Sequence, residues 1–176
     1  MSATIFGLST TPASAGQSLA HGAIRVRRAR LADASSISDL VNGFAAEDVM
    51  LPRTAEDVSL AIDHYFVAED ERARVLACAA LREYSPSLVE LVSVAVAREA
   101  HGHGLGRRVV EAAEGLALKR GYTELFAHTL TPEFFAALGY EVVERDLYPE
   151  KRCRPHTACM RKIFADAASS SFAAAA

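Results

Sequence analysis

The fold is decided by the stretch Val92-Ser-Val-Ala-Val-Ala-Arg-Glu-Ala-His101-Gly-His-Gly-Leu-Gly106-Arg-Arg-Val-Val110. It starts as an apolar, valine-rich run, passes through a polar joint and three glycines at every second position, and ends with helical apolar spacing. This order predicts a strand, a tight loop and a helix that begins at about Leu105. Glycine lets the backbone adopt positive φ, and a helix start presents unpaired N–H groups and the positive end of its dipole. The stretch therefore predicts an anion cradle, best suited to a phosphate.

Length and composition predict one domain with an ordinary core. The chain has 176 residues, of which 51% are hydrophobic, enough for one buried core. A net charge of −3 and a pI near 6.1 give no electrostatic reason to expect nucleic acid or an anionic membrane as the main partner. The sequence has neither an apolar run long enough to span a bilayer nor the pattern of a secretory signal. We therefore expect a cytoplasmic protein.

The cysteines do not resemble a disulfide framework. Cys78, Cys153 and Cys159 are odd in number, and Cys78 lies in an apolar, strand-like run, so reduced thiols are expected. A Cys153, His156 and Cys159 cluster offers three zinc ligands with unusual spacing and no clear fourth. We expect no metal site.

The chain divides into a domain at residues 24–164 between two flexible tails, residues 1–23 and 165–176, that are rich in small residues. Residues 24–28 alternate and predict the first strand. Asp33 is expected to cap a helix with Ile37, Leu40, Val41 and Phe44 on one face, weakened at its end by Asn42-Gly43. Thr54-Ala-Glu-Asp57 resembles a capping box for a second helix, whose predicted apolar face is Val58, Ala61, Ile62 and Tyr65.

The second half predicts a meander followed by alternating strands and helices. Residues 66–69, 74–84 and 88–97 are expected to form three antiparallel strands. The helix after the glycine loop should bury Leu105, Val109, Ala112, Ala113 and Leu116 and stop at Lys119-Arg120-Gly121. A strand at 123–128, a short helix begun by Thr131-Pro132-Glu133 and ended by Gly139, and strands at 140–144 and 158–164 complete the domain.

This order resembles the GNAT family of N-acetyltransferases. The acetyl-CoA pyrophosphate loop of that family reads Gln or Arg, two residues, Gly, one residue, then Gly or Ala; His101-Gly-His-Gly104-Leu-Gly106 matches both glycines and has His101 in the first place. A Rossmann site would instead need the loop after the first strand of a parallel βαβ unit. The resemblance implies an α/β (α+β) fold, with a mixed, mostly antiparallel twisted sheet of six to seven strands and about four helices.

The same resemblance implies acetyl-CoA as cosubstrate. The strand would present the main chain of Val94, Ala95 and Val96 to the pantetheine arm and the thioester carbonyl, which supplies the oxyanion donor. The implied loop contacts are His101, Gly102, His103, Gly104, Leu105, Gly106 and Arg107.

Residues 24–164 are more specifically similar to the acetyltransferase domain of bacterial N-acetylglutamate synthases, above all the short, stand-alone forms. The resemblance rests on segments that include 50–54, 77–81, 90–96, 126–129, 133–135 and 148–151. It implies acetylation of L-glutamate, the first step of arginine biosynthesis. Two departures are Val92, where many relatives carry Arg, and His128, where an apolar residue is common. A homodimer is expected by analogy with the fold alone.

Three residues are candidates for the proton chemistry. Glu90 begins an otherwise apolar strand, an expensive place for a carboxylate unless it is paired or functional, and we expect it to deprotonate the acceptor ammonium directly or through a water. Many relatives use a tyrosine on the short helix as general acid, but Phe135 stands there. Thr129 and Thr131 are the remaining candidates to protonate the thiolate, although Thr131 also fits an N-cap.

A glutamate acceptor carries carboxylates that favour arginine partners. Arg53, in the loop between the first two helices, is the best candidate, and Lys151 and Arg154 form a second basic group. The alternatives are another amino acid or a polyamine, for which Glu47-Asp48 would offer carboxylates, and a non-catalytic acyl-CoA-binding module.

Overall fold

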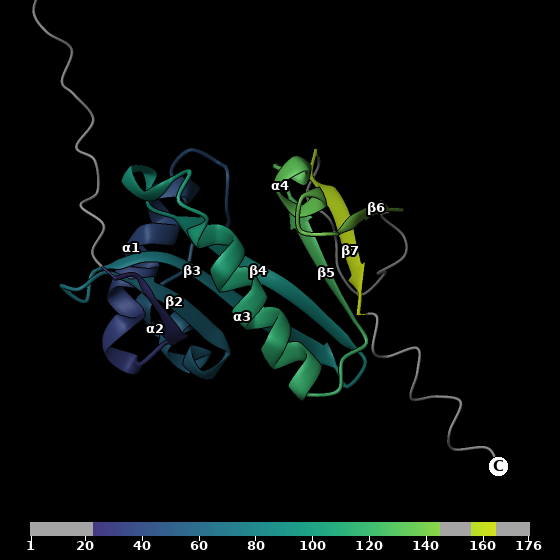
Figure 1. Ribbon diagram of the computed structural model, residues 1–176, viewed down its shortest axis with the longest axis horizontal. Helices are drawn as coiled ribbons and strands as arrows, with labels where there is room; N and C mark the ends of the chain where they lie inside the picture. Colours follow the sequence, from purple (N-terminus) through teal and green to yellow (C-terminus); the bar gives the residue numbers. More distant parts are fainter. Residues whose placement is uncertain (1–22, 145–155, 165–176) are drawn as a thin grey trace, which may run out of the picture.

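The computed structural model describes residues 23–144 and 156–164, which form a seven-stranded mixed sheet with helices on both faces (Figure 1). The strands are β1 (Arg25–Arg28), β2 (Tyr65–Glu69), β3 (Val75–Ser85), β4 (Leu88–Val96), β5 (Glu124–Thr129), β6 (Glu141–Val143) and β7 (Ala158–Ile163). The helices are α1 (Ala34–Ala45), α2 (Ala55–Leu60), α3 (Leu105–Lys119) and α4 (Pro132–Ala136), with 3₁₀ turns at Leu31–Asp33, Ile62–His64 and Arg98–Ala100. The predicted fold class is confirmed.

The strand order is β1-β2-β3-β4-β5-β7-β6. Strands β2 to β4 form the predicted antiparallel meander, and β1, whose place in the sheet was not predicted, adds an antiparallel edge strand next to β2. Strands β5, β7 and β6 form a second antiparallel group. The two groups meet where β4 and β5 run parallel, with Glu90 opposite Phe126 as their register pair. Figure 1 shows these strands close at one end and spread apart at the other. The sheet is therefore split beyond Glu90.

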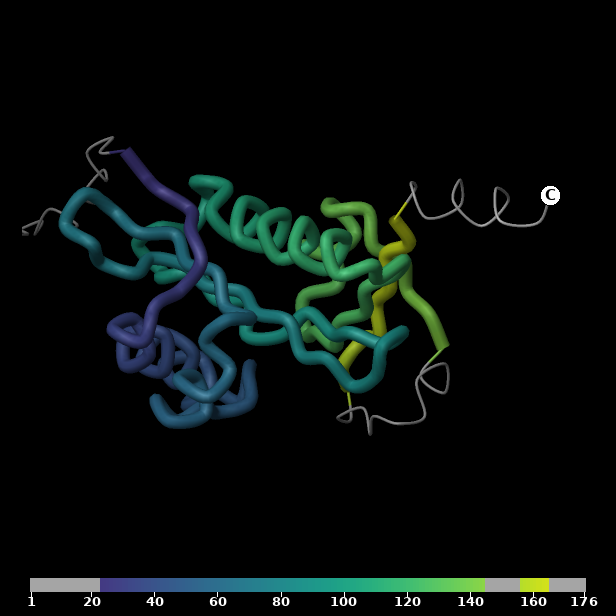
Figure 2. Tube along the Cα trace, turned by 90° about the horizontal axis from the view of Figure 1, so that it is seen from below, coloured from purple at the N-terminus to yellow at the C-terminus, as the bar shows by residue number. Residues whose placement is uncertain are grey.

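Helix α3 packs on one face of the sheet, and α1 and α2 pack on the other, as Figure 2 shows. The core on the α3 side includes Leu91, Val109, Leu125 and Ala127. The core under α1 and α2 includes Ile37, Val58, Cys78 and Ala95. Because side chains alternate along a strand, neighbouring residues of β4 and β5 reach opposite faces.

Several sequence predictions near the α1 and α2 helices need correction. Of the predicted face of the second helix only Val58 lies on α2, which ends at Leu60. Ala61 is its C-cap and Ile62 begins a 3₁₀ turn, whereas Tyr65 begins β2 opposite Ala80. Asp33 occupies the N-cap position of α1 but does not cap it, because its carboxylate accepts hydrogen bonds from Arg27 and from the Arg30 N–H. On α3, the predicted core residues Ala112 and Leu116 are only half-buried, whereas Ala117, which was not predicted, is fully buried.

Helix α1 continues through Asn42-Gly43 and ends two residues later, at Ala45. The Asn42 side chain accepts a hydrogen bond from the Arg53 N–H (2.9 Å) and donates one to the Arg53 carbonyl (2.8 Å). Ser38 also donates to that carbonyl (2.8 Å). Helix α1 therefore fixes the backbone of the loop that follows it.

Candidate active site

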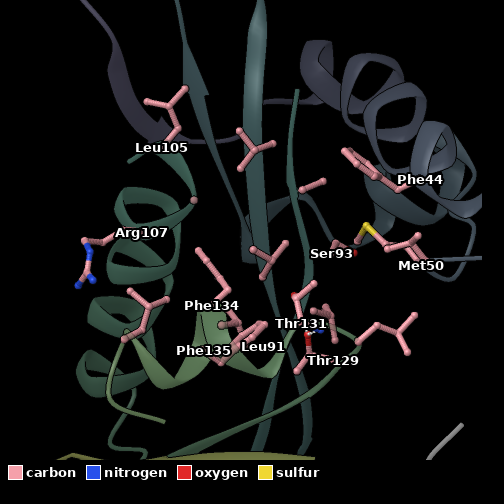
Figure 3. Close-up of a pocket in the computed structure, with 18 of the residues that line it drawn as sticks. Phe44, Met50, Leu91, Ser93, Leu105, Arg107, Thr129, Thr131, Phe134 and Phe135 are labelled. Carbon is pink, nitrogen blue, oxygen red and sulfur yellow. Dashed lines mark hydrogen bonds between the residues drawn. The ribbon is translucent and has the colours of Figure 1, made fainter. Parts of the chain in front are cut away.

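A cavity of about 710 Å³ opens where β4 and β5 separate (Figure 3). Its wall is built by the second half of β4, the end of β5, the glycine loop with the start of α3, helix α4, and residues 49–53 of the α1–α2 loop. Most of the residues that the sequence predicted for the site lie on this wall. Segments that are far apart in the chain thus meet at the split of the sheet.

The glycine loop has the geometry of a phosphate cradle. Gly102 and Gly104 have φ values of +77° and +73°, and nothing lies within 4 Å of a Cβ built at either position. Gly104 is the N-cap of the 15-residue helix α3 and has no side chain that could occupy the first-turn N–H groups. Because these donors and the helix dipole point into the loop, the residues present fit the pyrophosphate of acetyl-CoA.

Gly106 serves a different purpose from the one its place in the motif suggests. It is helical, without a positive φ, and a Cβ there would lie 3.1 Å from the Phe134 ring and 3.3 Å from Val96. Glycine at this position allows close packing of Phe134 and Val96 and is not needed for backbone freedom. Leu105, beside it, is buried, so only its main chain can contact a cosubstrate.

The charged and aromatic side chains of the loop are held by the protein itself. His101 donates from Nε2 to the Val96 carbonyl (2.8 Å) and stacks on Phe44, with ring centroids 6.4 Å apart. His103 Nδ1 donates to the His101 carbonyl (2.9 Å). The Arg107 guanidinium donates to the Ala137 carbonyl (2.9 Å), and Figure 3 shows it directed away from Leu91 and Phe134. His101 therefore braces the loop against β4 and α1.

Strand β4 contains a bulge beside the cavity. Cys78 of β3 lies opposite Ala95, whereas Ala80, two residues on, lies opposite Val92, so β4 carries one extra residue. Ser93 has a φ of +53° there, and its hydroxyl lies 3.2 Å from that of Tyr65. Bulges bend a strand and re-aim its backbone. Since β5 has already diverged, residues 94–96 line the cavity, as the sequence predicted for thioester contacts.

Glu90 lies at the narrow end of the split and is 1% exposed. The Tyr84 hydroxyl donates to its Oε2 (2.8 Å), and His128 Nδ1 lies 3.0 Å from its Oε1. Burial, then the charge of Glu90, raises the pKa of Tyr84 to about 12. Sequence reasoning assigned no role to Tyr84 or His128; the one signal was that His128 replaces an apolar residue common in relatives.

Thr129 and Thr131 lie together at the end of β5. Their hydroxyl oxygens are 3.1 Å apart, and the Thr131 N–H donates to Thr129 Oγ1 (2.9 Å). Thr131 stands at the N-cap of α4 with Pro132 next to it, as predicted, but its hydroxyl does not cap the helix. Phe135 is 5% exposed and packs edge-on against Tyr140, so its ring belongs to the core.

Arg53, the predicted acceptor residue within the described part of the chain, lies on the cavity wall. Its guanidinium donates a long hydrogen bond, 3.4 Å, to the Pro52 carbonyl and also interacts with the Tyr65 hydroxyl, while its backbone is held by Ser38 and Asn42 of α1. Val49, Met50 and Leu51 precede it on the same wall. Lys151 and Arg154, the other predicted acceptor residues, lie outside the described residues.

Within residues 23–144 and 156–164, no group of three or more His, Cys, Asp or Glu side chains could hold a metal ion. Cys153 of the weighed zinc cluster lies outside this part of the chain, and Cys159 is buried in β7. Over the same residues, no helix has the length and apolarity needed to cross a membrane.

Comparison with known proteins identifies the family. The family described as "Acetyltransferase (GNAT) family" matches residues 33–140. An uncharacterized N-acetyltransferase of Chlorobaculum tepidum is 40% identical over 141 residues, which are 80% of this chain and 90% of that protein. An amino-acid acetyltransferase of Mycobacterium tuberculosis is 32% identical over 121 residues, 68% of this chain and 69% of that protein.

A similar solved structure is the N-acetylglutamate synthase of Neisseria gonorrhoeae complexed with coenzyme A and N-acetyl-glutamate. It matches with a TM-score of 0.70 and 21% identity, over 82% of this chain and 36% of that one. At this identity the match supports the fold alone. With the family match, the split sheet and the glycine cradle together, the chain belongs to the GNAT family of acetyltransferases and is an acetyl-CoA-dependent N-acetyltransferase.

Proposed function

We propose that this enzyme acetylates the α-amino group of L-glutamate, the first step of arginine biosynthesis, in the cytoplasm. The observation that carries the proposal is Arg53, which lies on the cavity wall with its backbone held by Asn42 and Ser38. A positioned guanidinium suits a carboxylate because it can donate two parallel hydrogen bonds. The similarity to an amino-acid acetyltransferase supports an amino acid as acceptor. Lys151 and Arg154 remain candidates for the second carboxylate.

The reaction requires the acceptor nitrogen to lose two protons. The ammonium gives up one proton before attack, a C–N bond forms as the C–S bond breaks, and the nitrogen gives up the second proton as the amide forms. One proton ends on the CoA thiol and the other is released to solvent. The site therefore needs a proton acceptor near the amine and a proton donor near the sulfur.

Bound acetyl-CoA supplies an activated acetyl group as a thioester. In the proposed site the main-chain N–H groups of residues 102–107 hold the pyrophosphate, and the backbone of residues 94–96 orients the thioester carbonyl and stabilises its developing negative charge. Glu90 and its partner His128 stand at the narrow end of the split for the proton of the amine. Thr129 and Thr131, which share a hydrogen bond, are placed to hold a proton for the thiolate.

A second candidate acceptor is an amino acid with an apolar side chain. It is favoured by Val49, Met50 and Leu51, which line the wall beside Arg53. A polyamine is less well supported, since it would need free carboxylates in this loop and Glu47 is already paired with Arg98. The expected homodimer stays a prediction.

Release of free CoA thiol from acetyl-CoA, measured across amino acids and polyamines, tests the proposal. We expect the highest kcat/KM with L-glutamate. Loss of hydrogen bonds to a charged group costs about 1.5–3 kcal/mol, so Arg53→Ala should raise the KM for glutamate about 10- to 100-fold and leave the KM for acetyl-CoA unchanged. Arg72→Ala, at an exposed residue of the β2–β3 turn, is the matched control and should change neither constant.

The outcomes separate the candidates. Turnover with a neutral amino acid but not with glutamate supports the second candidate. Turnover with a polyamine alone contradicts any amino-acid acceptor. CoA binding without thiol release on any amine would indicate a binding module, in contradiction to the proposed function.

A further inference from the structure

Glu90 and His128 form a hydrogen-bonded pair at the cavity, and the geometry of this pair indicates which residue takes part in proton transfer and which one orients it. We propose that His128, not Glu90, takes the proton from the acceptor ammonium, and that Glu90 is the positioning residue that keeps the imidazole in its reactive tautomer. The inference rests on the acetyl transfer proposed above and names the proton acceptor of that same site.

The environment of Glu90 fits a supporting role better than direct contact with substrate. Its side chain is 2% exposed, against 8% for that of His128. Each carboxylate oxygen already accepts a hydrogen bond, one from Tyr84 on β3 and one from His128 on β5. The carboxylate is thus anchored between two strands, and it orients the imidazole of His128 toward the cavity.

The hydrogen bonds define the tautomer of His128. An ionised carboxylate can only accept hydrogen bonds, so the 3.0 Å contact requires a proton on Nδ1. In the neutral ring Nε2 then carries the lone pair and can accept a proton. The Tyr84 phenol, with a pKa of about 12, stays protonated and keeps donating to Glu90 at neutral pH. A carboxylate in this position also stabilises the imidazolium that forms.

The register of β5 places His128 on the acceptor side of the sheet. Leu125 and Ala127 pack into the core under α3, so alternation along β5 sends Phe126 and His128 to the face that α1 and α2 share, and Thr129 to the α3 face. His128 lines the cavity. The charged and titratable groups around it on the described neighbouring strands include Glu90 of β4 and Cys159 of β7, its register partner. Strand β3 adds Tyr84, which donates to Glu90, and Arg82, which lies opposite Glu90 and interacts with Tyr84.

The proton step is balanced within the pair. The lone pair of His128 Nε2 forms an N–H bond as one N–H bond of the ammonium breaks, which leaves a neutral amine and an imidazolium beside the Glu90 carboxylate. The amine lone pair is then available to attack the thioester, and the imidazolium returns its proton to solvent after product release. Both residues end each cycle as they began it.

The first test is independent of turnover. Long-range ¹H–¹⁵N NMR of the free protein reports which ring nitrogen of the neutral His128 carries the proton. We expect the Nδ1–H tautomer in the wild type and a loss of that preference in Glu90→Leu, which has no acceptor. An Nε2–H tautomer in the wild type would overturn the proposal, whichever amine the enzyme uses.

The second test uses kinetics on the best amine found in the panel. His128→Asn keeps a donor toward Glu90 and should fold normally, yet it should lower kcat about 10²- to 10⁴-fold, the usual contribution of a general base, and abolish the acidic limb of the pH profile. Added imidazole should restore activity to His128→Ala, in which the ring is missing. His64→Ala is the control, because His64 accepts a hydrogen bond from Arg120 and does not line the cavity. This variant should leave the acidic limb unchanged.

Glu90→Gln separates positioning from direct catalysis. Loss of the negative charge should lower kcat about 10- to 100-fold, the effect of removing a partner that orients a metal-binding histidine, and therefore less than His128→Asn does. If His128→Asn instead keeps the wild-type kcat and acidic limb, the histidine is not the proton acceptor and the proposal fails. Calorimetric binding of CoA to each variant shows that the cosubstrate site is intact.

Discussion

Replacement of Gly106 by alanine tests the packing that joins the glycine loop to helix α4. The new Cβ would lie 3.1 Å from two atoms of the Phe134 ring and 3.3 Å from Val96 Cγ2, whereas ordinary contacts begin at 3.4 Å. The ring must therefore retreat by about 0.3 Å, an adjustment of the size that overpacking forces on a close-packed site. Phe134 and Val96 both line the cavity, so the retreat also disturbs the thioester end of the site.

Gly115 provides a matched control on the same helix. Nothing lies within 4 Å of a Cβ built there, and its φ is not positive. Alanine in place of glycine inside a helix gains about 1 kcal/mol, so Gly115→Ala should stabilise the protein. Gly106→Ala shares part of this gain but adds an overpacking cost of about 1–3 kcal/mol. The free energy of unfolding of Gly106→Ala should therefore fall about 1–3 kcal/mol below that of Gly115→Ala.

Urea unfolding followed by far-UV circular dichroism measures this difference, because the slope with denaturant should be equal in the two variants. In thermal unfolding the difference corresponds to roughly 2–4 °C per kcal/mol for a chain of this size. Gly106→Ala should also raise the KM for acetyl-CoA, and Gly115→Ala should not. Equal stability of the two variants would refute the close packing of Phe134 on the start of α3.

Two further predictions concern the cradle and the acid stability of the fold. Gly104→Ala meets no neighbour but must adopt a φ of +73°, which costs about 1–2 kcal/mol for a residue with a Cβ, so calorimetry should show weaker CoA binding; unchanged affinity would contradict the assignment of this loop. Hydrogen bonds from Arg27 lower the pKa of Asp33 and of Glu69 below their ordinary values of 3.8 and 4.5. The stabilisation from these ion pairs is complete above these values and is lost as the pH falls below about 4. Urea unfolding should therefore show that Arg27→Met is less stable than the wild type at pH 7 and that its stability depends less on acid pH. An equally steep loss of stability with acid in the variant would refute the role of Arg27.

The sequence predicts the local structure of the candidate site well where that structure depends on neighbouring residues. The glycine loop, the strand before it and the start of α3 form one continuous stretch, and local periodicity is enough to place them. Gly106 was predicted as part of the loop, but its contact with Phe134 comes from a helix 28 positions later, which local patterns do not report. Its role in packing therefore became visible only in the structure.

The pairing of Glu90 with His128 could not be predicted from local sequence patterns for a related reason. Glu90 stood out because a carboxylate in an apolar strand needs a partner, but the partner lies 38 residues away. The contact exists because β4 and β5 run parallel with Glu90 opposite Phe126, which brings His128, two positions further on, to the same face. Without that register the sequence offers several histidines, and the one signal for His128 is that it replaces an apolar residue common in relatives.

The split sheet explains how one strand can serve both halves of the proposed reaction. His128 and Thr129 are neighbours on β5 and point to opposite faces of the sheet. In the proposed reaction these faces are the acceptor side and the cosubstrate side respectively. Strand pairing at Glu90 is needed to hold the histidine, and strand separation beyond it is needed to open the cavity. The proton chemistry is thus tied to the sheet, whereas Arg53 is positioned by α1 through Asn42 and Ser38. Changes in the α1–α2 loop can therefore alter the acceptor without disturbing the groups that move the proton.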